Sequence, residues 1–240
     1  MQAKRDERRR LARFLSDNFA LLVSLPRNDV ELGKAALDAG ADGLKVHINL
    51  RHHASGLDTG SLEDEAPRLA QIIALGAPVG IVPGAGETVA SPEDLRRLDA
   101  MGIDFFDLYA DDMPAWMLRM DDTAMSVMVA FGAHCWPWGL VEDVQGESRP
   151  DMIEASIIEH EGYGGPLTAA DVSAYAEIAS RSGLPVIVPT QRAIRPGEVG
   201  VLRDAGAAGV LIGAIVTGTD PEPLAQATAQ FRQAVDALTA

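Results

Sequence analysis

The stretch LPVIVPTQRAIRPGEVGVLRDAGAAGVLIGAIVTG, residues 184–218, contains one complete strand–helix–strand unit. Two short β-branched runs, 185–190 and 209–213, enclose a segment with helical spacing at 196–205. Gly206 follows that segment, and glycine at this point allows the left-handed conformation that commonly ends a helix. A strand, a helix and a second strand in this order predict two parallel strands in one sheet.

The same pattern recurs along the whole chain. We expect eight strands, at 20–25, 42–50, 78–82, 104–110, 126–131, 152–158, 185–190 and 209–213. Helical spacing is clearest at 30–39, 92–100, 168–182, 196–205 and 221–238. Eight alternating units in 240 residues favour an α/β fold of the closed (βα)₈ TIM-barrel type over an open doubly wound sheet.

Residues 1–240 are expected to form a single barrel domain, with residues 1–18 as an extra N-terminal helix. Leu11, Phe14 and Leu15 would form the apolar stripe of this helix, which could cover the bottom of the barrel.

Composition excludes several classes of function. The chain has 20 basic and 35 acidic residues, a formal charge of −15, which disfavours nucleic acid and anionic membranes as partners. The longest apolar runs are far shorter than the roughly 20 residues of a membrane span, and the charged start lacks a signal core, so a cytoplasmic location is expected. A single cysteine, Cys135, excludes an internal disulfide and a cysteine zinc site. A homodimer is expected only as a habit of this fold.

Polar residues alternate with aliphatic ones in the second predicted strand. Lys45, His47 and Asn49 share one face, which we expect to point into the barrel because the aliphatic residues suit the helix-facing side. Such an inward row is either a buried hydrogen-bond network or a site. The functional interpretation is an acid–base or Schiff-base lysine, whose pKa burial would lower.

Acidic residues accompany this row on two further strands. Asp107 and Glu154 are expected to face inward, and Asp107 could pair with Lys45 in a purely structural role. Glu159, at the end of the sixth strand, suits a substrate contact or proton transfer beside a glycine-rich turn.

The loops after the last two strands are where many barrels bind phosphate. Here Thr190 and Gln191 could donate hydrogen bonds, and Arg192 or Arg195 could supply positive charge. Gly213 leads into a short helix, where backbone N–H groups can approach an anion.

Residues 184–218 resemble the last βαβ unit of the ribulose-phosphate-binding barrel superfamily, in particular N-acetylmannosamine-6-phosphate epimerases and prenylglyceryl-phosphate synthases. The stretch IIEHEGYGGP, residues 157–166, is similar to the end of strand six in the synthases. The resemblance implies that Glu159 and Tyr163 hold the polar substrate, and that Gly213 and Ala214 hold its phosphate. The chain departs from the family at residues 189–192, where Pro-Thr-Gln-Arg replaces a glycine-rich loop and removes backbone donors.

These observations predict an enzyme that acts on a small phosphorylated sugar or polyol by acid–base chemistry, as an isomerase, epimerase or aldolase-type lyase. Prenyl transfer to a glycerol phosphate and a non-catalytic small-molecule-binding barrel remain alternatives. No cofactor is expected. No metal is expected either, because the adjacent His52 and His53 would point to opposite faces of an extended segment. The Trp136-Pro137-Trp138 motif suits a lid, an apolar wall or a subunit interface.

Overall fold

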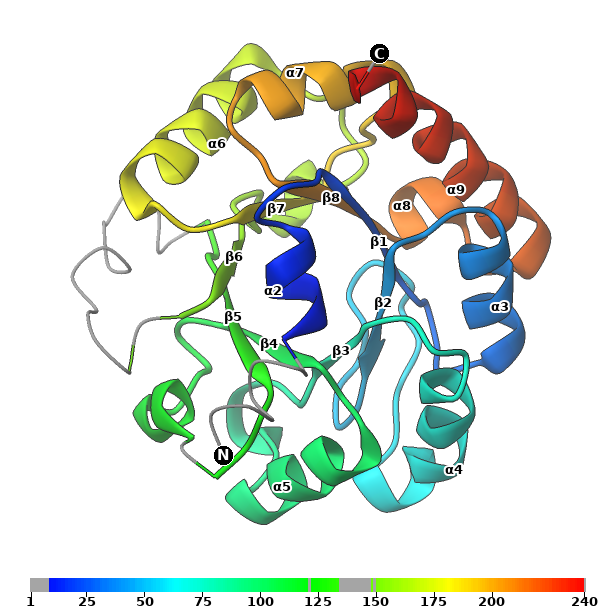
Figure 1. Cartoon of the computed structure of the whole chain (residues 1–240), viewed down its shortest axis with the longest axis vertical. Helices are drawn as coiled ribbons and strands as arrows, with labels where there is room; N and C mark the ends of the chain where they lie inside the picture. Colours follow the sequence, from blue (N-terminus) through cyan, green and yellow to red (C-terminus); the bar gives the residue numbers. More distant parts are fainter. Residues whose placement is uncertain (1–8, 121, 134–147, 149, 240) are drawn as a thin grey trace.

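A computed structural model describes residues 9–120, 122–133, 148 and 150–239 of the chain. Eight parallel strands close into one barrel in sequence order, and helices surround them (Figure 1). The strands are β1 (Ala20–Ser24), β2 (Gly43–His47), β3 (Val79–Val82), β4 (Phe105–Tyr109), β5 (Ser126–Ala130), β6 (Met152–Glu154), β7 (Val186–Pro189) and β8 (Gly209–Ile212). The predicted (βα)₈ TIM barrel is therefore confirmed.

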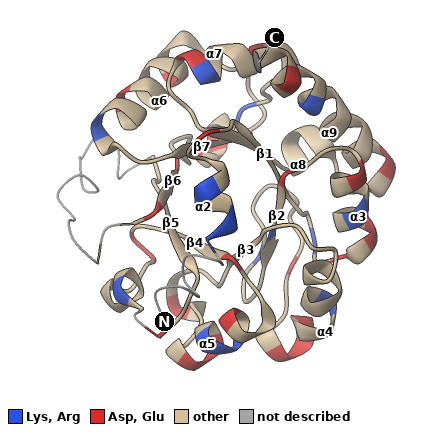
Figure 2. Cartoon of the chain, viewed as in Figure 1, with Lys and Arg blue, Asp and Glu red and all other residues tan. Residues whose placement is uncertain are grey.

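The outer layer consists of helices that follow the strands. The longer ones are α3 (Val30–Asp38), α4 (Leu62–Ile73), α5 (Pro92–Met101), α6 (Ala169–Ser182), α7 (Val199–Asp204) and α9 (Pro221–Asp236). Shorter helical turns are α8 (Ala214–Thr217), η1 (Gly86–Thr88), η2 (Ala115–Arg119), η4 (His160–Gly162), η5 (Pro196–Glu198) and η6 (Ala237–Thr239). Charged residues lie mainly on the outer helices, whereas the strands are mostly uncharged (Figure 2).

Local sequence explains where several helices begin and end. Ser61 begins α4 and Thr168 begins α6, each with a capping box that an aspartate three residues later completes. Gly102 and Gly183 end α5 and α6 in the left-handed conformation. The helix expected at 196–205 is divided into the 3₁₀ turn η5 and α7, because the segment begins with a Pro-Gly pair.

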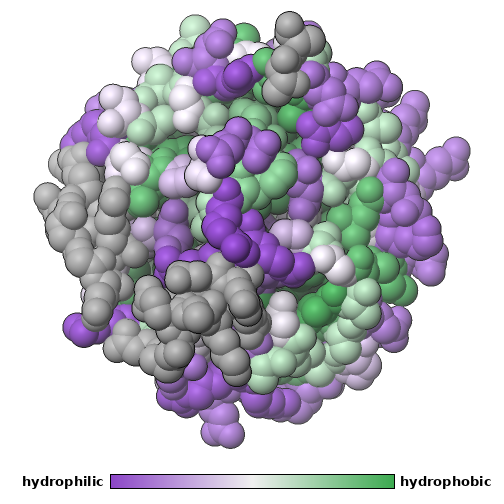
Figure 3. Space-filling view, in the orientation of Figure 1, coloured by the Kyte–Doolittle hydropathy of each residue, from purple (hydrophilic) through white to green (hydrophobic). Residues whose placement is uncertain are grey.

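The predicted N-terminal helix is confirmed in place but not in length. The described part is α2 (Arg10–Phe14), whose Leu11 is buried with Leu22 and Phe105 at the amino ends of the strands. The helix ends at Phe14, where Asn18 Nδ2 donates to the Phe14 carbonyl oxygen. In the view down the barrel, α2 lies within the ring of strands and shows hydrophilic residues to solvent (Figures 1 and 3).

Two layers of apolar packing hold the barrel. The larger lies between strands and helices, and the smaller fills the amino-terminal half of the barrel interior. In the interior, Gly80 makes room for Phe105 on the neighbouring strand, since a Cβ at Gly80 would lie 2.0 Å from the Phe105 ring. The apolar filling therefore occupies one half of the barrel and leaves the carboxyl half to polar side chains.

Several predicted features lie outside the described residues. They are Cys135, Trp136-Pro137-Trp138 and residues 1–8 of the expected N-terminal helix. That residues 1–240 form one domain and that the chain forms a homodimer both stay predictions. Among the described helices, none has the length and apolar character needed to cross a membrane.

Candidate active site

The strand β2 delivers two polar side chains to the inside of the barrel, as the alternation predicts. Lys45 and His47 are 6% and 3% exposed, while Leu44 and Val46 pack against the helices. Asn49 does not continue the row. The strand ends at His47, and Asn49 turns the chain with a φ of 58°, so it lies outside the set of side chains that line the pocket.

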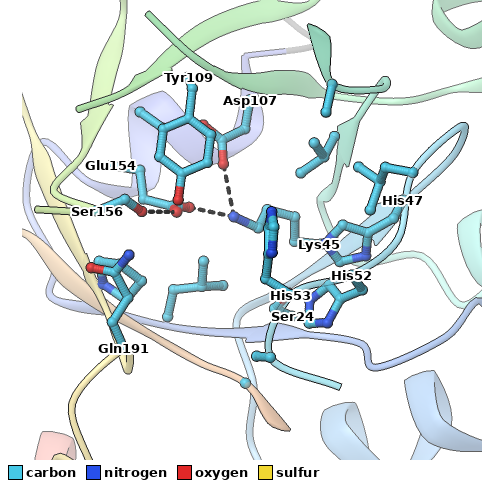
Figure 4. A pocket seen from close by; sticks show the side chains of 18 of the residues that line it. Ser24, Lys45, His47, His52, His53, Asp107, Tyr109, Glu154, Ser156 and Gln191 are labelled. Atoms are coloured by element: carbon cyan, nitrogen blue, oxygen red, sulfur yellow. Dashed lines mark hydrogen bonds and ion pairs between the residues drawn. The ribbon is translucent and has the colours of Figure 1, made fainter. Parts of the chain in front are cut away.

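Lys45 lies between two buried carboxylates from other strands. Its Nζ is 2.7 Å from Asp107 Oδ2 of β4 and also donates to Glu154 Oε2 of β6 (Figure 4). Ser156 Oγ donates to the second oxygen of Glu154, at 2.6 Å. The three charged side chains thus form one cluster at the carboxyl end of the barrel, and the predicted pairing of Lys45 with Asp107 is observed.

The two acidic groups of this cluster differ in the direction of their pKa shifts. Burial and the negative charge of Glu154 raise the pKa of Asp107 well above its usual range, although Lys45 opposes this. Burial also disfavours ionisation of Glu154, but Lys45 and hydrogen bonds from Asp107 and Ser156 outweigh it and lower the Glu154 pKa. The pKa values of the two coupled groups are thus displaced in opposite directions, that of Asp107 upward and that of Glu154 downward.

Lys45 stays charged in this environment. Burial lowers its pKa, but the attraction of Asp107 and Glu154 is larger in sum and raises the pKa above the ordinary value. Burial therefore acts on the Lys45 pKa in the expected direction, but the net pKa lies above its ordinary value and not below it. The reason is that two acidic partners, rather than one, contact the ammonium group.

A pocket of about 170 Å³ opens above this cluster. Lys45, Asp107 and Glu154 line it together with residues of almost every strand end, including Ser24, Val82, Tyr109, Ala130, Ser156, Pro189, Thr190, Gln191 and Gly213. Burial raises the pKa of Tyr109 and of Tyr163, so both phenols keep their protons. Tyr163 Oη accepts a hydrogen bond from Gln191 Nε2 at 2.7 Å.

Three histidines that line the pocket, His47, His52 and His53, form what we call its roof. The loop between β2 and α4, residues 48–61, carries His52 and His53, and both line the pocket. The His52 ring meets the His47 ring edge to face at 4.4 Å, and the His53 ring lies 4.2 Å from that of His160 on η4. Because β2 and β6 are on opposite sides of the barrel, the His53–His160 contact spans its mouth.

Burial keeps the roof histidines uncharged at neutral pH. Burial, and then the charges of His52 and Lys45, lower the pKa of His47 far below its ordinary value. Burial also lowers the pKa of His52, to about 4, and that of His53. His47 Nδ1 is buried without a hydrogen-bond partner among the described residues.

The structure brings together eight of the twelve predicted site residues. Those lining the pocket are Lys45, His47, Asp107, Glu154, Tyr163, Thr190, Gln191 and Gly213. Four do not line it: Asn49, the exposed Glu159, Ala214 and Arg192. Their expected roles in catalysis or binding stay predictions.

The cations expected for the phosphate are engaged elsewhere. The Arg192 guanidinium forms a two-point pair with Asp171 on α6 and donates to the Gly162 carbonyl oxygen at 3.0 Å. Arg195 is paired with Glu198 at the surface. Thr190 Oγ1 accepts the N–H of Gly213 at 3.0 Å, so these two predicted phosphate ligands bind each other.

Sequence reasoning does not predict that His52 and His53 line the pocket. It considers His52 and His53 as possible metal ligands, sets that role aside and gives them no other place in the site; within the described residues no group of three or more His, Cys, Asp or Glu side chains is arranged to hold a metal. The available signal was their position directly after an inward-facing strand, because such loops border the site in barrels of this kind. Ser24 and Ser156 gave no signal beyond strand alternation.

Comparison with known proteins supports the fold. No protein-family model matches the sequence, and the curated proteins searched contain no match. Solved structures do match. They include phosphoribosyl anthranilate isomerase from Thermus thermophilus, with a TM-score of 0.66 and 15% sequence identity. The match covers 92% of this chain and 100% of that one. Thiamine phosphate pyrophosphorylase from Pyrococcus furiosus has TM-score 0.63 and 16% identity, over 92% and 98%.

A third similar structure is a 3-hexulose-6-phosphate synthase, with TM-score 0.64 and 13% identity over 90% of this chain and 99% of that one. At these identities the likeness shows the fold alone. The chain has the TIM-barrel fold of enzymes named for phosphorylated compounds, which is consistent with the resemblance to the ribulose-phosphate-binding superfamily.

Proposed function

We propose that this protein is an enzyme that transfers protons on a small phosphorylated sugar or polyol, as an isomerase, an epimerase or an aldolase-type lyase. The observation that carries the proposal is the ammonium group of Lys45 between Asp107 and Glu154 on the floor of the pocket. Two carboxyls whose pKa values are pushed in opposite directions form an acid and base pair.

The roles follow from the protonation states. Glu154, ionised, is the group that accepts a proton from a carbon next to a substrate carbonyl. Asp107, which keeps its proton, is the group that returns one. Lys45 has three N–H donors, of which Asp107 and Glu154 take two. The third is available to a substrate oxygen and would stabilise negative charge that develops on it.

A Schiff-base mechanism is less compatible with this arrangement. It needs a neutral amine as the nucleophile, whereas contact with the acidic groups of Asp107 and Glu154 raises the Lys45 pKa. Polarisation of a carbonyl by a permanently charged Lys45 needs no such change.

We place the phosphate of the substrate at Gly213 and Ala214. Gly213 lines the pocket, and α8 begins directly after it. The first N–H groups of a helix have no acceptor within the helix and suit an anion. Arg192 and Arg195 are engaged elsewhere, and the Gly213 N–H is bound by Thr190 Oγ1. This part of the proposal therefore rests on the backbone N–H groups of α8 itself, beginning with Ala214.

The test is proton exchange. The protein would be incubated in D₂O with dihydroxyacetone phosphate or ribulose 5-phosphate, and deuterium uptake and products would be followed by NMR. We expect uptake at a carbon beside a carbonyl, and its loss in Glu154→Gln. The matched control is Glu177→Gln, an exposed carboxylate on α6 outside the pocket that should leave exchange unchanged.

Other outcomes would replace the proposal. A rise in melting temperature with these compounds, but no exchange, would indicate the non-catalytic binder. A rise in melting temperature with an isoprenoid diphosphate, together with its transfer to glycerol phosphate, would indicate the prenyl-transfer reaction instead.

A further inference from the structure

The side chain of Asn28 holds the backbone of His47 from two sides. Asn28 Nδ2 donates to the His47 carbonyl oxygen at 2.6 Å, and Asn28 Oδ1 accepts the His47 N–H at 3.1 Å. Asn28 is 5% exposed and His47 is 3% exposed, so water has little access to these bonds. A primary amide presents one donor and one acceptor side by side, as a neighbouring strand would.

This contact replaces a strand that has ended. The last backbone bond between β1 and β2 runs from the Leu25 N–H to the Lys45 carbonyl oxygen, and the chain then leaves the sheet. On the other side β3 still pairs, since the Ile48 N–H donates to Val82. Without Asn28, both backbone groups of His47 that face β1 would be buried and unpaired, and the position of His47 would lose its support on that side.

Glu65 of α4 fixes the orientation of this amide. Glu65 Oε2 accepts Asn28 Nδ2 at 3.0 Å, so the NH₂ group of Asn28 must point toward Glu65 and its oxygen toward the His47 N–H. Glu65 Oε1 accepts the N–H of Gly60 at 3.2 Å. Glu65 is 8% exposed, which is unusual for a glutamate on an outer helix.

Glu65 thereby connects both ends of the loop at 48–61. One end is His47, which it reaches through Asn28, and the other is Gly60. The loop itself is closed by bonds between its two arms, from Asn49 N–H to Gly60 and from Thr59 N–H to Leu50. Since this loop carries His52 and His53, the same two side chains determine where three pocket histidines lie.

We propose that Asn28 and Glu65 are positioning residues: they fix His47 and the histidine-bearing loop over the Lys45 cluster. Neither of the two residues lines the pocket, so they would act on the site through His47 and the loop. The consequence for turnover rests on the proposed function, whereas the effect on histidine placement does not.

The test uses the ¹⁵N NMR signals of the histidine rings in labelled full-length protein without substrate. Asn28→Ala should shift or broaden the ring signals of His47 and His52. In Glu65→Gln the side-chain oxygen can still accept the NH₂ group of Asn28. The Gly60 N–H, however, then faces either the new NH₂ group of the glutamine or an oxygen that it must share with Asn28. The substitution should therefore affect His52, on the loop, more than His47. If a substrate is found, Asn28→Ala should lower kcat by about 100-fold with a much smaller change in KM.

Asp42→Ala is the matched control. Asp42 also pins a strand backbone, accepting the Leu21 N–H at 2.8 Å, but it lies at the opposite end of β2. It should lower the melting temperature without moving the ring signals. Unchanged His47 and His52 signals in Asn28→Ala would overturn the proposal; if that variant does not fold, unchanged signals in Glu65→Gln would do so. Absence of exchange in the wild type would count against the proposed function alone.

Discussion

Lys45 of β2 and Asp107 of β4 are in direct contact, with 2.7 Å between Nζ and Oδ2, although β3 runs between their strands. The residue of β3 beside Lys45 is Gly80, and the ring of Phe105 fills the space in front of it, so Lys45 reaches past β3 to Asp107 by the length of its own side chain. The long lysine side chain can therefore cross the interior and reach Glu154 on β6 as well. One cation thus connects three strands at the level where substrate would bind.

Replacement of Lys45 by methionine should cost about 3 kcal/mol of unfolding free energy, because it leaves two buried carboxyls without their cation. Turnover should be abolished, in this variant and in Lys45→Ala. Without the ammonium group the pKa values of both carboxyls rise, so the folded state binds more protons than the unfolded state. Stability should then fall as the pH rises above about 4, which denaturant unfolding at several pH values would measure.

Lys34→Met is the control for this variant. Lys34 pairs with Asp38 on the exposed surface of α3, so its loss should have little effect on stability, as is usual for exposed ion pairs. Equal effects at the two lysines would show that the buried cluster has no special role in stability.

The two acidic residues should respond unequally to amide substitution. An asparagine in place of Asp107 would resemble the protonated acid, because its oxygen can accept from Lys45 and its NH₂ can donate to Glu154. Asp107→Asn should therefore cost about 1 kcal/mol or less near neutral pH. Glu154→Gln removes the ionised partner of Lys45 and should cost about 3 kcal/mol. Thermal unfolding of both variants would measure the difference, and the reverse order would mean that the proton resides on Glu154.

The fold could be read from the sequence because every unit repeats the same local signals. Strand alternation predicted that Lys45, Asp107 and Glu154 all face the inside of the barrel. Because the barrel is closed, side chains that face its inside come close together. Alternation failed where strands ended early. β2 ends at His47, so Asn49 leaves the inward row, and no residue pattern marks that end except the turn itself.

Partners across long sequence distances were beyond prediction. Arg192 looked like a phosphate ligand from its place after strand seven, but Asp171 of α6 lies close enough to bind two of its three guanidinium nitrogens. The contact between His53 and His160 joins loops from opposite sides of the barrel. Such contacts depend on how loops lie over the mouth, which neither periodicity nor capping residues specify.

His52 should make the protein less stable in mild acid. Its pKa is about 4 in the folded protein, against a usual value of about 6.5, so the unfolded state binds the proton more readily. The stability that the neutral ring provides is complete above about pH 6.5 and is lost as the pH falls toward about 4. Between about pH 7 and pH 5 the loss should be about 2 kcal/mol.

Denaturant unfolding of wild type and His52→Asn across this range would check the value. Asparagine has no titration there and retains a hydrogen-bonding side chain near Ser55, so the variant should show a flatter profile. A variant profile as steep as that of the wild type would assign the dependence to other groups, beginning with His47.

The contact between His53 and His160 should hold the loop at 48–61 in place. Removing the ring in His160→Ala forfeits a packed aromatic pair, worth about 1 kcal/mol. Hydrogen exchange of the loop amides, such as the Gly56 N–H that donates to His52, should become several-fold faster, about 5-fold for that energy. Glu161→Ala, at the neighbouring exposed position, serves as the control, and equal exchange in the two variants would contradict a role for the ring.

Gly80 should tolerate no side chain while Phe105 is present. A Cβ at Gly80 would lie 2.0 Å from the Phe105 ring, which is far inside contact distance, and the ring is buried in the barrel without room to move away. Gly80→Ala should therefore lower the free energy of unfolding by about 1 to 3 kcal/mol. For a chain of this size, this corresponds to a melting temperature that is lower by about 2 to 10 °C. Gly197→Ala is the control, because a Cβ there meets nothing within 4 Å.

The double variant Gly80→Ala with Phe105→Leu should recover part of the loss, since the smaller side chain vacates the space. Additive losses in the double variant would show that the clash does not arise between these two residues.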